Sequence, residues 1–165
     1  MARRAFYSFH YKPDVQRVAK IRNIGVIEGN RPATDNDWEE ITGGGDKKIR
    51  EWITDQLSGR TCTIILIGSS TANRKWINYE IKESWNKKKG VLGIYIHNIT
   101  NLDGKQSSKG SNPLYHILHT PSGKRLSSIA KTYDPPRKTS SGVYNYIADN
   151  IEDWIEEAIA IRNNY

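Results

Sequence analysis

The 165-residue sequence has almost no cysteine and no long apolar run. Its single cysteine, Cys62, excludes an intramolecular disulfide and a multi-cysteine metal site, and it agrees with a reducing compartment. The longest apolar stretch, residues 61–68, is far shorter than the roughly 20 residues of a membrane helix. The first residues also contain no apolar signal segment. We therefore expect a cytoplasmic, globular protein without a membrane partner.

Charge is the first positive feature of the sequence. Lys and Arg number 25 against 18 Asp and Glu, which gives a net charge of +7. Such an excess favours polyanions, including nucleic acids and nucleotides. The basic residues nevertheless occur in short groups, such as residues 87–89, and no RNA-recognition, zinc-finger or basic-zipper motif accompanies them. Nucleic-acid binding is therefore disfavoured as the main function, and a salt titration would detect it.

Apolar spacing predicts alternating strands and helices along the chain. The expected strands lie at residues 4–9, 26–27, 61–67, 91–96 and 127–133. Asp14 is expected to cap a helix that ends before Gly25, and further helices are expected from Asp46 to Gly59, over residues 73–88 and over residues 143–161. Residues 29–45 are polar and irregular, which predicts a long surface loop.

This alternation predicts one α/β domain over residues 1–165, with a mainly parallel central sheet flanked by helices in a flavodoxin-like three-layer fold. Ligands bind such sheets at the carboxyl ends of the strands. The loops that follow the expected strands at 4–9, 61–67 and 91–96 should therefore converge. These loops carry Ser8, His10, Tyr11, Ser69, Ser70, His97 and Asn98.

Several known ligand motifs are missing. Gly43, Gly44 and Gly45 precede an expected helix, but the sequence has neither a Walker A motif nor a dinucleotide-binding glycine motif. The acidic pocket of a receiver domain is also missing. His116 and His119 could share a helix face, but a pair without nearby Cys, Asp or Glu seldom forms a metal site. We expect no bound metal and no resident cofactor.

Glu80 lies within the apolar stripe of the helix expected at residues 73–88, beside Trp76, Ile77 and Ile81. Burying a carboxylate is costly unless it has a partner or a function. Taken alone, this position favours a half-exposed Glu paired with Lys or Arg. A functional carboxylate is the second reading.

Three segments together resemble one known family. They are R-A-F-Y-S-F-H-Y at residues 4–11, G-S-S-T-A-N-R-K-W-I-N-Y-E-I at 68–81 and K-G-S-N-P-L at 109–114. In this order they resemble the TIR-like family of the Thoeris anti-phage system, the ThsB proteins, over about residues 3–115. The W-x-x-x-E-I pattern from Trp76 to Ile81 is also similar to the helix of TIR NADases that carries their catalytic glutamate.

The resemblance implies a TIR-like fold with NAD as the substrate. It implies cleavage of the nicotinamide glycosidic bond and release of a cyclic ADP-ribose-type nucleotide that activates a separate effector. Glu80 would be the catalytic residue, because a carboxylate near the ribose stabilises oxocarbenium character, as in glycoside hydrolysis. The resemblance places Phe6, Ser8, His10, Tyr11 and Asn112 beside the dinucleotide. With Ser69 and His97 from the converging loops and Trp76 beside Glu80, they make up the expected substrate-binding set.

Alternatives remain open for several of these residues. Phe6 fits the sheet core as well as the site, Trp76 fits packing beneath Glu80, and Asn112 fits an ordinary turn. Ser69 could cap a helix instead of binding a ligand. The chain as a whole could also be a non-catalytic TIR-like module that binds a nucleotide or another protein, and assembly into homo-oligomers is open.

Overall fold

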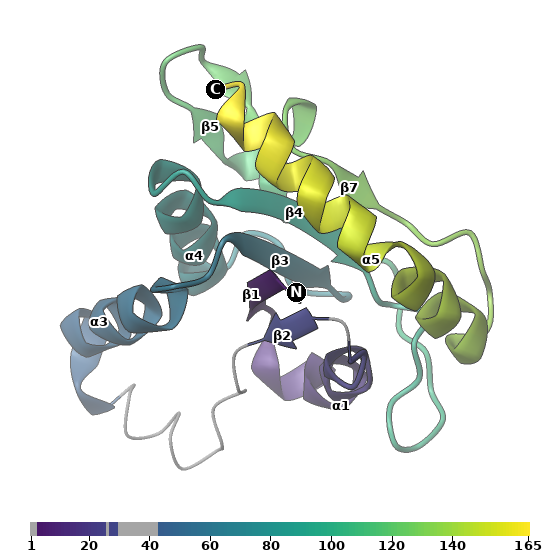
Figure 1. Cartoon of the computed structure of the whole chain (residues 1–165). Helices are drawn as coiled ribbons and strands as arrows, with labels where there is room; N and C mark the ends of the chain where they lie inside the picture. Colours follow the sequence, from purple (N-terminus) through teal and green to yellow (C-terminus); the bar gives the residue numbers. More distant parts are fainter. Residues whose placement is uncertain (1–2, 26, 30–42) are drawn as a thin grey trace.

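The computed structural model describes residues 3–25, 27–29 and 43–165 (Figure 1). Its main sheet has five parallel strands in the order β2-β1-β3-β4-β7. They are β1 (Arg3–Ser8), β2 (Ile27–Gly29), β3 (Cys62–Ile67), β4 (Gly90–Tyr95) and β7 (Thr132–Tyr133). β3 is central and buried along its whole length, as its continuous run of β-branched and apolar residues predicts.

Four helices and several short elements surround this sheet in the described residues. The helices are α1 (Tyr11–Arg22), α3 (Gly45–Leu57), α4 (Lys75–Asn86) and α5 (Ser140–Asn163). Between β4 and β7 lie a small hairpin and two 3₁₀ turns, namely β5 (Leu118–His119), β6 (Lys124–Arg125), η1 (Pro113–His116) and η2 (Leu126–Ser128). None of the helices in the described ranges is long and apolar enough to cross a membrane.

The helices cover the sheet as two layers, with α1 and α5 on one side and α3 and α4 on the other (Figure 1). Strand alternation decides which residues enter each layer. Ala5 and Tyr7 of β1 pack with α1 and α5, whereas Phe6 packs with α3. The same alternation places Ser8 on the side of α3 and α4. The carboxyl end of β1 therefore directs a hydroxyl group toward the layer that contains Glu80.

The fold class is confirmed: the chain is an α/β protein with a parallel sheet between helical layers. The prediction that Asp14 caps a helix is wrong, because α1 begins at Tyr11 after an N-cap at His10, which places Asp14 inside the first turn. The strand expected at residues 127–133 shortens to Thr132–Tyr133 behind the η2 turn. Residues 30–42, within the expected loop, and Val26 lie outside the described residues.

Candidate functional site

Glu80 lies on the buried side of α4, where Ile77 and Ile81 anchor the helix in the core. Its side chain is only 9% exposed. Among the described residues, no Lys, Arg or His forms an ion pair with it. The expectation of a half-exposed, paired Glu is therefore wrong. The described part of the fold thus holds Glu80 at the border between core and solvent without an ion-pair partner.

Burial raises the pKa of Glu80 from 4.5 to about 8, and the Ser8 hydroxyl opposes this shift. Ser8 is fully buried, and its Oγ makes no hydrogen bond of standard length and angle among the described residues. At neutral pH the Glu80 carboxyl is thus mainly protonated in the free protein. A cation placed beside it would favour the ionised form.

Hydrogen bonds link the backbone at Glu80 to the central strand β3. The Ser84 hydroxyl donates to the Glu80 carbonyl over 2.6 Å, and it also shares a 2.6 Å hydrogen bond with the Thr63 hydroxyl of β3. All of these groups are buried. A hydroxyl that bridges helix and strand limits sliding of α4 along the sheet, so the position of Glu80 is fixed relative to β1 and β3.

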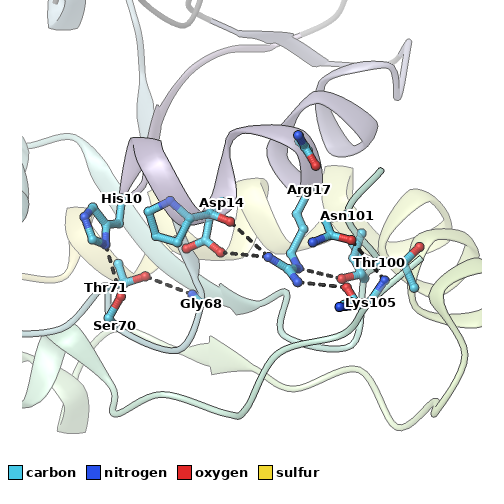
Figure 2. A network of polar contacts seen from close by, with 12 residues as sticks. His10, Asp14, Arg17, Gly68, Ser70, Thr71, Thr100, Asn101 and Lys105 are labelled. Carbon is cyan, nitrogen blue, oxygen red and sulfur yellow. Dashed lines mark hydrogen bonds and ion pairs between the residues drawn. The ribbon is translucent and has the colours of Figure 1, made fainter. Parts of the chain in front are cut away.

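His10 and the turn after β3 form a second polar contact at the carboxyl edge. His10 Nδ1 lies 3.1 Å from Ser70 Oγ (Figure 2). Partial burial, and secondarily the charge of Arg74, lowers the pKa of His10, which favours the neutral ring. Ser69 is exposed on the same turn. Tyr11 is the first residue of α1, and its ring lies 6.2 Å from that of Phe9.

Two of the aromatic candidates, Phe6 and Trp76, lie in or beside the core between β1 and α3. Phe6 is 1% exposed and packs with Ile49, Ile53 and Leu57. Phe6 therefore packs in the sheet core, which is one of the two placements that the sequence left open. Trp76 is half-buried against the same cluster and meets the ring of Tyr79 edge to face at 5.6 Å.

His97 and Asn112 lie at the ends of β4 and β7. Burial lowers the pKa of His97, while Asp134 raises it and Lys109 lowers it further. His97 Nδ1 is buried without a hydrogen-bond partner among the described residues. The Asn112 amide donates to Thr132 Oγ1 over 3.0 Å, and its oxygen accepts from the Leu114 amide at 3.0 Å. Asn112 therefore caps η1 and tethers it to β7.

Residues 109–112 connect these two groups of candidates. Lys109 Nζ lies 4.5 Å from the ring centre of Tyr95 and 2.9 Å from an Asp134 oxygen. A Cβ on Gly110 would fall 2.2 Å from the Gly68 carbonyl oxygen, so this backbone lies directly on the end of β3. The structure thus brings Ser8, His10, Ser69 and Glu80 to the ends of β1 and β3. His97 and Asn112 lie at the neighbouring strand ends.

Sequence reasoning missed Asp14 and Arg17, which are both buried at the same edge. A sequence signal existed, because these two residues share the helical spacing of Val18 and Ile21 and so fall on the apolar face of α1. The same criterion had singled out Glu80. His119, considered with His116 for a metal, instead accepts a 3.0 Å hydrogen bond from Trp85 Nε1. The described ranges contain no group of three or more potential metal ligands.

A parallel sheet between two helical layers, with an acid on α4 beside the end of β1, is the arrangement expected of a TIR-like domain. The family model described as "Thoeris protein ThsB, TIR-like domain" matches residues 6–101. The chain is also 35% identical over 133 residues to the Bacillus cereus (strain MSX-D12) protein named "Putative cyclic ADP-D-ribose synthase ThsB1". That alignment covers 76% of this chain and 69% of the relative. The chain belongs to the TIR-like ThsB family of Thoeris proteins.

Proposed function

We propose that this chain is an NAD-consuming enzyme that cleaves the nicotinamide–ribose bond and forms a cyclic ADP-ribose-type nucleotide. In Thoeris anti-phage defence, that nucleotide would activate a separate effector protein. The observation that carries the proposal is the unpaired, buried Glu80 carboxyl beside the Ser8 hydroxyl. Family membership and the name of the Bacillus cereus relative support the reaction class.

The chemistry requires an acid in such a position. As nicotinamide leaves, the ribose gains oxocarbenium character, and a nearby carboxylate stabilises the developing positive charge. The nicotinamide ring of NAD is itself cationic. Its arrival beside Glu80 would lower the pKa of this residue, so that NAD binding releases a proton and generates the catalytic anion. Stabilisation is strong there because burial excludes water.

The remaining candidates are proposed to bind the substrate and are not assigned a chemical step. The Ser8 hydroxyl, beside the Glu80 carboxyl, is proposed to bind a ribose hydroxyl, and Ser69 on the exposed turn is suited to a phosphate or ribose oxygen. His10 and His97 offer neutral rings at the same edge. NAD is the substrate, and no resident cofactor enters the reaction. Cyclisation then requires a nucleophile of the same molecule to reach the ribose before water does.

The test is incubation of purified protein with NAD, with and without lysate of infected cells, followed by chromatography and mass analysis. We expect nicotinamide and a product with the mass of ADP-ribose less one water. Glu80→Gln keeps the size but removes the charge, so turnover should fall by at least about 10²-fold. Glu83→Gln is the matched control, because Glu83 lies on the same helix and pairs with Lys87 at 3.8 Å.

Unchanged turnover in Glu80→Gln would overturn the catalytic assignment. Absence of nicotinamide under every condition, lysate included, would overturn the enzymatic proposal. The chain would then be a non-catalytic TIR-like module for nucleotides or protein partners.

A further inference from the structure

Asp14 is a second buried acid with no evident folding role. Its side chain is 1% exposed, and neither carboxylate oxygen has a hydrogen-bond partner among the described residues. The nearest cation is Arg17, with Nη1 3.6 Å from Oδ1. Burial raises the pKa of Asp14 from 3.8 to about 6 even though Arg17 lowers it, so ionised Asp14 opposes folding. Because the N-cap of α1 is His10, the helix does not depend on Asp14 as its cap.

The carboxylate of Asp14 packs directly on the end of β3. A Cβ at Gly68 would fall 2.2 Å from Oδ2 and 2.5 Å from Oδ1, so any other residue there would displace the Asp14 carboxylate. The Gly68 amide donates to Thr71 Oγ1 over 2.9 Å, which closes the turn that leads into α4 (Figure 2). Ser70 on this turn contacts His10. Asp14 therefore lies beneath the turn that carries two candidate binding residues, Ser69 and Ser70.

Arg17 joins α1 to the segment that follows β4. Its guanidinium donates to the carbonyls of Ile99 and Lys105 over 2.7 and 2.8 Å, and to the Pro13 carbonyl over 3.0 Å (Figure 2). The chain then runs from Lys105 to Gly110, which lies on the Gly68 carbonyl. Asp14 contacts both Arg17 and Gly68, Arg17 binds the Lys105 carbonyl, and the chain from Lys105 to Gly110 leads back to Gly68, so these links form a closed ring. We call Asp14, Arg17, Gly68 and Gly110 the edge junction.

We propose that Asp14 and Arg17 are positioning residues for the NAD site, holding the 68–71 turn and residues 97–112 in place across the carboxyl edge of the sheet. The inference rests on the proposed function. The 68–71 turn carries Ser69 and leads into the helix of Glu80, and residues 97–112 begin and end with two proposed binding residues, His97 and Asn112. The carboxylate of Asp14 contacts Gly68 of the turn and Arg17, so Asp14 acts on the site through the backbone and through Arg17.

The decisive variant is Asp14→Asn, which keeps the shape and removes the charge. We expect the KM for NAD to rise about tenfold or more while kcat changes less. Amide hydrogen exchange should become faster in residues 68–71 and 97–110 but not in the α5 core. The melting temperature at pH 7.5 should stay equal or rise, because a buried charge is gone. Asp149→Asn, an exposed acid on α5, is the matched control and should change none of these quantities.

Arg17→Lys is the second variant. It keeps a positive charge but loses the planar fork that reaches two carbonyls at once, so exchange should become faster at residues 99–105. Unchanged exchange in both segments of both variants would overturn the proposal. The proposal would also be overturned if Asp14→Asn lost activity only in proportion to a lower melting temperature. Should the wild-type protein fail to turn over NAD, the proposed function falls, whereas the exchange measurements still decide whether the edge junction holds the two segments.

Discussion

Two regions of the same sheet edge bury an acid, and they differ in what the acid can reach. Glu80 lies on the α3–α4 side, 9% exposed and without an ion-pair partner among the described residues, whereas Asp14 lies on the α1–α5 side, 1% exposed and next to Arg17. Burial raises both pKa values. If the proposed function holds, this difference in exposure and partners separates two roles: Glu80 would act on the substrate, whereas Asp14 would act through Arg17 and the backbone of the 68–71 turn.

The two acids share one thermodynamic consequence. A carboxyl whose pKa is higher in the folded than in the unfolded chain binds its proton more tightly when folded. The free energy of unfolding therefore falls as pH rises from about 4.5 to about 8 for Glu80, and from about 4 to about 6 for Asp14. Keeping two such groups lowers stability at neutral pH, which is typical of functional sites.

The largest effect that should distinguish the two acids is the pH dependence of turnover. If only ionised Glu80 supports the reaction, kcat/KM for NAD should rise by nearly tenfold per pH unit well below pH 8 and level off near it, which gives about a fiftyfold rise from pH 6 to pH 8. Nicotinamide release at low NAD and constant ionic strength measures it, with tryptophan fluorescence as the check on folding. Asp14→Asn should retain this slope. A profile that is flat between pH 6 and 8 would contradict the role of Glu80.

The next effect separates the two acids through Gly68. Gly68→Ala places a methyl group on the Asp14 carboxylate and should lower the free energy of unfolding by about 1–3 kcal/mol. Asp14→Ala in the same chain should restore much of this loss, because the clashing oxygens are gone. Urea unfolding of both single variants and the double variant measures the coupling. Gly25→Ala, where no atom lies within 4 Å of the new Cβ, is the control. If the changes in unfolding free energy were additive, Gly68 and Asp14 would not be in steric contact.

The smallest predicted effect belongs to Ser8. Ser8→Ala removes the hydroxyl that lowers the pKa of Glu80, so the activity profile should shift toward higher pH, and turnover at pH 7.5 should fall roughly 2–5-fold. Turnover rates measured at several pH values would resolve this shift. Ser122→Ala, which changes a serine on the turn between β5 and β6, is the control. A profile that moves to lower pH would reverse the assigned role of Ser8.

The sequence was sufficient for much of the fold, because long apolar runs such as Cys62–Ile67 admit few alternatives. The prediction from sequence failed where contacts between distant segments determine the local structure. Aspartate is a residue type typical of helix N-caps, yet the helix starts three residues before Asp14 and buries its side chain. β7 is two residues long and depends on pairing with Gly93 and Ile94 of β4, which no local pattern encodes.

The candidate site was predictable only in part. Glu80 could be singled out because it interrupts an apolar stripe, and the family resemblance supplied its role. That Glu80 is only 9% exposed, and has no ion-pair partner among the described residues, could be seen only from the packing of α4 against the sheet. The contact between Gly68 and Gly110 joins residues 42 positions apart and has no local sequence signal.

The most direct test of the central claim compares Glu80→Gln with the wild-type protein at pH 8 for both nicotinamide release and urea unfolding. We predict opposite signs: NAD cleavage falls by at least about 10²-fold, while the free energy of unfolding rises by up to a few kcal/mol because the buried acid is no longer ionised. Glu83→Gln should leave cleavage unchanged. Retained NAD cleavage in a folded Glu80→Gln protein would contradict the account.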